Sequence, residues 1–306
     1  MKSNDQKEPN TASKKKSIIQ YSLIAVAAIT IGVTAGIAGK RVFGQTQIDY
    51  DGFNPENYRM DSKELVRQYD KNPRKSFTPA ELINIGLEKY RTCEYSHSIG
   101  IGTAHTIVDQ TIRNIQIRQG EHYFEESLSR SSMMSLGWRA FQEPDGIELY
   151  KGKAIENEVG QFKSDNKKDL TADEYRDAWG KTLEEMFIFL ISNETVLDEG
   201  TEVKKLENGN IEVTVALNPD IATYYYKFQM KTMSSLESLP VFSKVTQTYT
   251  FKSDMTLIHS YMEEDYVATM GVTTKIHNTL AYYYYANEKI DIPALDESCD
   301  YSVKEN

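Results

Sequence analysis

The sequence predicts an α+β protein in which helices pack on a large, curved, antiparallel β-sheet, preceded by one transmembrane helix. Ser17–Gly39 is an uncharged run of 23 residues, and a helix of that length crosses a bilayer core of about 30 Å. After residue 76, roughly ten segments of strand character are separated by short reversals. Helix start signals occur among them without regular strand–helix alternation, which favours an antiparallel sheet with a few helices.

The membrane segment determines the expected topology. Residues 1–16 are polar and lysine-rich, so we expect a short disordered cytoplasmic tail. Five lysines precede the segment, whereas Lys40, Arg41 and Arg59 follow it closely. Because cations favour the cytoplasmic side, the expected location is the cell membrane, with a single pass, the N-terminus in the cytoplasm and the C-terminal domain outside. Sparse cysteine use favours a bacterial cell-surface protein.

Two features of this segment leave alternatives open. Gly36-Ile37-Ala38 has the small-residue spacing of a signal-peptide cleavage site, although the apolar run exceeds the usual length of about 7–15 residues. Ala28, Gly32 and Gly36 recur every fourth residue and form a stripe of small residues that permits close helix–helix contact. We expect an uncleaved anchor, with signal-peptide cleavage as the alternative. We expect the small-residue stripe to face lipid, with dimerisation through it as the alternative.

Residues 40–76 are interpreted as a stalk between the membrane and the folded domain. They are polar and contain Pro55 and Pro73. A short helix is expected near Ser62–Tyr69, because Asp61 and Glu64 have the spacing of a helix cap.

The extracytoplasmic α+β domain is expected to occupy residues 77–292. Thr78-Pro79-Ala80-Glu81 combines a capping box with proline in the first turn, and so predicts a helix that ends near Arg91. Turn residues at Gln119-Gly120 and Glu143–Gly146 then separate strands. The strands expected in this half are Ser98–Thr106, Ile107–Arg118, Tyr123–Ser131, Leu136–Gln142 and Ile147–Lys151.

The second half of the domain begins with another capping box. Thr171-Ala172-Asp173-Glu174 opens a helix through about Trp179, and Leu183–Ile191 is apolar enough to be buried. Asn218-Pro219-Asp220 starts a third helix, with Ile221, Tyr224, Tyr225 and Phe228 at core spacing. The strands expected here are Thr195–Leu206 and Ile211–Leu217 around the Asn208-Gly209 hairpin turn, then Val241–Lys252, Leu257–Met270 and Val272–Tyr285. Residues 293–306 form a C-terminal tail.

In the strand Val241–Lys252, the alternate positions of Val241, Val245, Tyr249 and Phe251 predict one covered face.

This order of elements resembles the LolA-like half-barrel family, which includes the mycobacterial LprG-type lipoproteins. The resemblance covers Phe77–Tyr285: an opening helix, a long run of antiparallel strands, helices at Thr171–Trp179 and Pro219–Ser235, then closing strands. It is one of layout, without a signature motif. It implies an extracytoplasmic domain that binds lipid-modified or other apolar molecules. A tethered domain does not ferry cargo between membranes, so the membrane helix is compatible with a fixed receptor, a hand-off station or a sensor.

Charge and motifs exclude several functions. The formal net charge is −10, and the part after Arg41 is more acidic still, which argues against nucleic acid as a partner. Gly100-Ile101-Gly102 lacks the third glycine of a dinucleotide fingerprint, because His105 stands there. We find no nucleophile elbow and no zinc-protease spacing, and the five histidines are dispersed. The expectation is a protein that is not an enzyme, with no metal and no cofactor.

Two cysteines, Cys93 and Cys299, lie on the predicted outer side of the membrane, where disulfides persist. They could pair and fix the tail to the start of the domain, or remain free thiols.

The aromatic residues point to the expected binding function. In Tyr282–Tyr285, alternation places two rings on each face of a sheet. Tyrosine suits a wall that is half apolar and half polar. The predicted function is binding of a lipid or other apolar ligand in a cavity between sheet and helices; the alternative is interaction with a cell-envelope protein, or a sensor module. The candidate wall residues are Trp138, Phe141, Phe228 and Tyr283.

Overall fold

The computed structural model describes residues 50–106, 108–132, 135–144, 146–154, 161–234, 236–270, 272–292 and 301–302. The predicted tail 1–16, the membrane segment 17–39 with Ala28, Gly32 and Gly36, and Cys299 lie outside the described residues. From Tyr50 onward, the described helices include none with the length and apolar character needed to cross a membrane.

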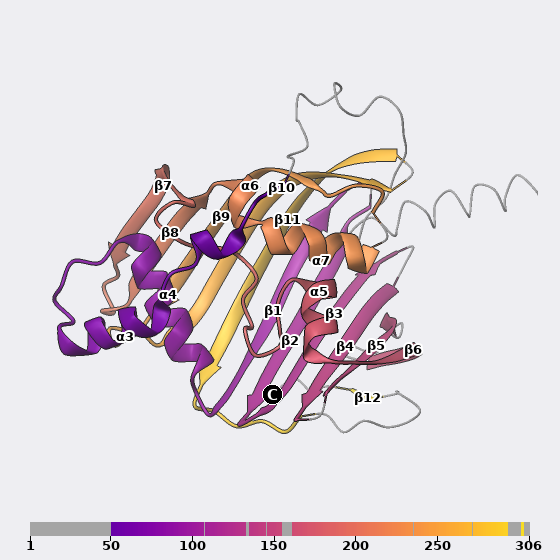
Figure 1. Cartoon of the computed structure of the whole chain (residues 1–306), viewed down its shortest axis with the longest axis horizontal. Coiled ribbons are helices and arrows are strands. Elements are labelled where there is room, and N and C mark those ends of the chain that lie inside the picture. Colours follow the sequence, from indigo (N-terminus) through magenta and orange to yellow (C-terminus); the bar gives the residue numbers. More distant parts are fainter. Residues whose placement is uncertain are drawn as a thin grey trace, which may run out of the picture.

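The described residues contain twelve strands in one antiparallel sheet (Figure 1). The spatial order is β12-β6-β5-β4-β3-β2-β1-β11-β10-β9-β8-β7. Strands β1–β6 form an N-terminal meander and strands β7–β11 form a C-terminal meander, and the pairing of β1 with β11 joins the two. The predicted α+β class with a large, curved antiparallel sheet is confirmed, and the sheet is open because β12 and β7 are its edges. The strands are β1 (Tyr95–His105), β2 (Gln110–Gln119), β3 (His122–Ser131), β4 (Ser135–Glu143), β5 (Gly146–Ala154), β6 (Gln161–Leu170), β7 (Val196–Lys205), β8 (Ile211–Leu217), β9 (Val241–Phe251), β10 (Leu257–Met270), β11 (Val272–Ala286) and β12 (Tyr301–Ser302).

The helices lie on one side of the sheet, here called the helix face (Figure 1); the opposite side is called the outer face. They are η2 (Pro55–Tyr58), α3 (Ser62–Lys71), α4 (Pro79–Arg91), α5 (Ala172–Trp179), α6 (Pro219–Ala222) and α7 (Tyr224–Ser234). The capping boxes predicted at Thr78 and Thr171 are both present, with each threonine hydroxyl bound by the third backbone amide of its helix. Local capping chemistry therefore fixes the starts of α4 and α5.

Three groups of buried side chains form the core. The largest packs α4 on β8–β11; there, Gly86 makes room for the Phe251 ring, which would lie 2.1 Å from an added Cβ. A second group, including Trp138 and Trp179, packs α5 on β3–β5. A third lies on the outer face and contains Ile115, Ile117, Phe124, Leu128, Phe141 and Tyr150, with Ile290 and Ile292 against it.

Residues 50–76 belong to this packed structure, so the prediction of a stalk over this stretch is wrong. Leu65 and Tyr69 of α3 are buried in the main core. The Tyr50 hydroxyl donates to the carbonyl oxygen of Asp220 at 2.6 Å. The packed domain therefore extends at least to Tyr50 rather than beginning at residue 77.

Other differences from the predicted elements have local causes. β6 was not predicted because its sequence, QFKSDNKKDL, has little apolar alternation. The third predicted helix is divided at Thr223 into α6 and α7. In β9, the register shift opposite Asp265 and Tyr266 places Phe242 in the core instead of Val241. In the predicted tail, Tyr301–Ser302 pairs with β6.

Candidate functional site

A cavity of about 200 Å³ lies between the helix face of the sheet and a covering segment, residues 181–192. Its floor comes from β1–β4 and β9–β11, and α7 adds one side. The sequence predicts burial of Leu183–Ile191 within this segment. The stretch is buried or half-buried apart from the exposed Glu184, although it forms neither helix nor strand. Apolar side chains supply much of the lining, notably Ile112, Met186, Phe187, Phe189, Met262 and Leu280.

Two glycines of β1 shape the floor. Gly100 and Gly102 both lie on the helix face, opposite Tyr282 and Leu280 of β11. A Cβ at Gly100 would lie 2.6 Å from the Tyr282 ring, and one at Gly102 would lie 2.2 Å from the Thr279 carbonyl oxygen. Gly100 thus allows Tyr282 to lie across β1, where its hydroxyl accepts a hydrogen bond from the Asn114 side chain at 2.7 Å, and Gly102 makes room for Leu280 and the Thr279 carbonyl.

A buried ion pair in the cavity wall joins Lys181 of the covering segment to Glu125 of β3. Lys181 is almost fully buried, and its Nζ lies 2.6 Å from a Glu125 carboxylate oxygen. Gln116 donates to the other oxygen of Glu125 at 3.0 Å and to the Met186 carbonyl at 3.1 Å. All four residues line the cavity. A charged pair in this position can orient the polar end of a bound molecule while apolar side chains hold the remainder.

Glu264 of β10 lies fully buried beside this wall. One carboxyl oxygen accepts from the Tyr226 hydroxyl at 3.1 Å and from the Asn278 side chain at 2.7 Å, and both partners line the cavity. Its other oxygen has no hydrogen-bond partner among the described residues. Burial raises the pKa of Glu264 to about 7, although the two hydrogen bonds lower it. The carboxyl can therefore change its protonation state near neutral pH.

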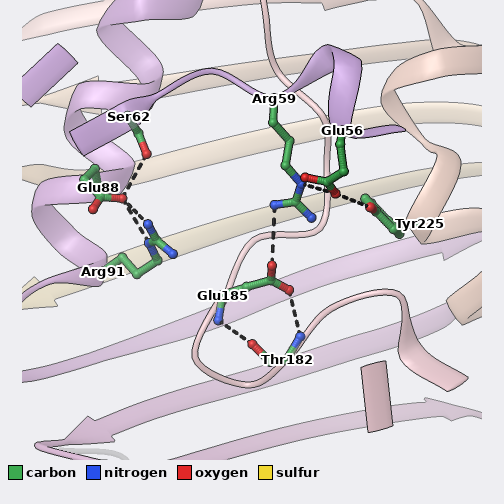
Figure 2. A network of polar contacts seen from close by, with 8 residues as sticks. All are labelled: Glu56, Arg59, Ser62, Glu88, Arg91, Thr182, Glu185 and Tyr225. Atoms are coloured by element: carbon green, nitrogen blue, oxygen red, sulfur yellow. Dashed lines mark hydrogen bonds and ion pairs between the residues drawn. The ribbon is translucent and has the colours of Figure 1, made fainter. Parts of the chain in front are cut away.

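A polar network holds the covering segment on the side that faces away from the cavity (Figure 2). Arg59 forms ion pairs with Glu56 at 2.9 Å and with Glu185 at 3.4 Å. Glu56 also accepts from the Tyr225 hydroxyl at 2.8 Å. The Glu185 carboxylate accepts from the Thr182 amide at 2.9 Å, which closes the turn of the covering segment. Arg59 thereby connects the N-terminal part of the domain to the roof of the cavity.

A second set of contacts in Figure 2 fixes α3 on α4. Ser62 donates to the buried carboxylate of Glu88 at 3.0 Å, and Arg91 pairs with the same carboxylate. This set supports the N-terminal helices and does not touch the cavity.

The four predicted wall residues are placed at different sites. Trp138 lines the cavity. Phe141 lies on the outer face, because positions three apart in a strand point to opposite sides. Phe228 packs against Tyr50 and Tyr224, with ring centroids 6.3 and 5.0 Å away. Tyr283 is 47% exposed on the outer face, and the last three residues are absent from the cavity lining.

The prediction that Tyr282–Tyr285 alternate between the two faces of the sheet is confirmed. The predicted wall residue, Tyr283, lies on the face away from the cavity. Tyr282 and Tyr284 line the cavity, while Tyr283 and Tyr285 are exposed. Lys181, Glu125 and Glu264 were not predicted from the sequence. Only tertiary packing distinguishes these from the many solvated charges of the chain, so no local pattern could have identified them.

Cys93 is half-buried, and its thiol donates to the Lys89 carbonyl at 3.3 Å. Burial raises the pKa of the Cys93 thiol. Because Cys299 lies outside the described residues, its pairing with Cys93 stays a prediction.

Comparison with known proteins adds no relative: no family model matches the chain, and no curated protein matches it.

Proposed function

We propose that this domain binds a lipid or another apolar molecule in the cavity beneath the covering segment, at the membrane surface to which the predicted helix anchors it. The observation that carries the proposal is an internal space of about 200 Å³ with a mostly apolar lining. An apolar cavity of about 150 Å³ is enough to hold benzene. The space thus suits a ring or part of an acyl chain, and a larger ligand would require the covering segment to move.

The polar groups of the wall favour an amphipathic ligand. Lys181 and Glu125 present paired charges to the cavity, and Tyr226 and Asn278 present side chains that also bind Glu264. Burial of a polar group costs free energy unless the group forms hydrogen bonds, either with other protein groups or with a bound molecule. An apolar molecule with a hydrogen-bonding head group would use both parts of the lining. The resemblance that the sequence layout suggests to LolA-like half-barrels would imply the same class of ligand.

Native mass spectrometry with organic extraction tests this function. The chain from Gln45 onward is purified from cells that make their normal lipids, alongside Ser127→Phe, which fills the cavity from β3. The control is Ser243→Phe on the exposed outer surface of β9. The expected result is a discrete added mass in the parent and the control that is lost in Ser127→Phe. An apo mass in the parent, or equal loading of both variants, would contradict the proposal.

A second candidate is binding of a cell-envelope protein at the outer face. Ile101, Tyr261, Tyr283 and Tyr285 lie on neighbouring strands there and are 37–54% exposed. Exposed aromatic clusters of this kind favour protein contacts. A photo-crosslinking residue in place of Tyr283 tests this candidate in cells. A discrete conjugate supports it, while crosslinking no greater than from Lys167, which is exposed on the outer face of the distant strand β6, would exclude it.

A further inference from the structure

We propose that the outer face binds a divalent transition-metal ion such as Zn²⁺ through Glu263, Asp265 and His277. This site is separate from the cavity, and it was not expected from the five dispersed histidines of the sequence.

The sheet register brings the three side chains together. Glu263 and Asp265 are two positions apart on β10 and so point to the same face. His277 of β11 lies directly opposite Asp265. One ligand atom from each of the three residues lies within 4.8 Å of the others, and all three side chains are partly exposed.

The spacing fits coordination of one ion. Nδ1 of His277 lies 2.8 Å from an Asp265 carboxylate oxygen. Ligands at about 2.1 Å from a tetrahedral Zn²⁺ lie roughly 3.4 Å apart, so small rotations of these side chains place an ion between them. One nitrogen and two oxygen donors suit Zn²⁺ and other divalent first-row transition metals better than Ca²⁺, which takes six to eight oxygen ligands.

His105 provides a fourth donor beside this set. It lies on β1 directly opposite His277, and the two rings are stacked with centroids 6.1 Å apart. The Nδ1 atom of His105 is 2.9 Å from a carboxylate oxygen of Asp109, the arrangement by which carboxylates orient metal-binding histidines. A surface hollow at this point gives an ion access to the donors, and its lining includes His105, Ser243, Asp265 and His277 together with the exposed Lys275.

Lys244 contacts the Glu263 carboxylate and is the cation that an incoming metal ion would replace. Its side chain is 46% exposed, so it can move into water at little cost. Removal of Lys244 should therefore strengthen metal binding, whereas a purely structural ion-pair cluster would only lose a contact. This opposite response distinguishes a metal site from a structural cluster.

A matched control exists elsewhere on the sheet. His122 and Glu143 form another histidine–carboxylate pair, at 2.6 Å and with similar exposure. The pair is not part of a three-residue donor group within the described residues. Substitution of His122 should therefore leave metal affinity unchanged.

Isothermal titration of the full chain with Zn²⁺, and Co²⁺ absorption spectra, test the site. We expect one saturable ion per chain, affinity reduced more than about tenfold by His277→Asn or Asp265→Asn, unchanged affinity in His122→Asn, and tighter binding in Lys244→Ala. No saturable binding, or equal affinity in His277→Asn and the parent, would overturn the proposal. If His277→Asn fails to fold, weaker or unchanged binding in Lys244→Ala would overturn it instead.

Discussion

At the scale of single residues, Glu264 makes folding stability depend on pH. Its pKa is about 7 in the folded protein, against an ordinary value of 4.5. The folded state therefore keeps a proton that the unfolded state releases between these values, so this group's stabilisation is complete below about pH 4.5 and is lost as the pH rises through about 7. The pKa difference corresponds to about 3 kcal/mol.

Replacing Glu264 with glutamine removes this ionisation while keeping a similar shape. We expect Glu264→Gln to raise the free energy of unfolding by up to about 3 kcal/mol at pH 8 and to leave it nearly unchanged at pH 4.5. Urea denaturation at both pH values measures the difference. Glu212→Gln on the outer face of β8 is the control, and an effect of Glu264→Gln that is equal at both pH values would contradict the assignment.

The Lys181–Glu125 pair illustrates a different property of buried charge. Lys181→Met leaves the Glu125 carboxylate with Gln116 but without its cation, and we expect a loss of about 3 kcal/mol of folding stability. A double variant, Lys181→Met with Glu125→Leu, should recover most of that loss because it removes the isolated charge. Denaturant titration of Lys181→Met, Glu125→Leu and the double variant gives the coupling energy.

The exposed pair Lys204–Glu202 provides the comparison for this experiment. Lys204→Met should change stability by less than about 1 kcal/mol. Equal costs for Lys181→Met and Lys204→Met would show that the wall pair is effectively solvated.

At the scale of elements, α4 and α5 depend on the same local signal. Each begins with a threonine whose hydroxyl binds the third backbone amide, while the glutamate at that position binds back to the threonine amide. Thr78→Ala and Thr171→Ala should each destabilise the fold by about 1 kcal/mol, and serine at either position should be nearly neutral. Thermal or urea unfolding checks this, and equal effects of alanine and serine would refute a capping role.

Helices and turns with local sequence signals could be predicted, whereas the face of the sheet on which a given strand residue lies could not. The capping boxes located α4 and α5 almost to the residue, and Asn208-Gly209 located the β7–β8 hairpin. Trp138 and Phe141 illustrate this limit of sequence analysis. The alternation of side chains along a strand predicts that the two residues face opposite sides of the sheet, but only tertiary packing decides which side holds the cavity. Polar β6 offered no periodicity to detect, and its pairing with β5 supplies the stabilisation instead.

At the scale of the whole molecule, the candidate sites arise from register between distant segments. The metal donors are brought together by β10 and β11, and the cavity combines strands from both meanders with the covering segment. Sequence spacing carries no information on these juxtapositions, because the central β1–β11 pairing joins residues about 180 positions apart. The general expectation of a sheet–helix cavity was open to sequence reasoning; its polar wall was not.

Several polar contacts join the covering segment to the rest of the domain, and Arg59 makes the one that connects Glu185 to Glu56 of η2 (Figure 2). Arg59→Ala should loosen this roof without disturbing the main core, because Arg59 is partly exposed and lies outside that cluster. We therefore expect faster amide hydrogen exchange in residues 183–191 than in the parent protein, with global unfolding free energy changed by no more than about 1 kcal/mol.

Mass spectrometry of exchanged peptides measures this effect, with Arg67→Ala as the control, since Arg67 pairs with Glu64 within α3. If residues 183–191 exchange at the same rate in Arg59→Ala and Arg67→Ala, the ion pair does not fasten the roof. If exchange rises throughout the sheet as well, Arg59 supports the whole fold. Acceleration confined to residues 183–191 would instead identify the segment that has to move for a molecule larger than the present cavity to enter, and would connect the N-terminal part of the domain to ligand access.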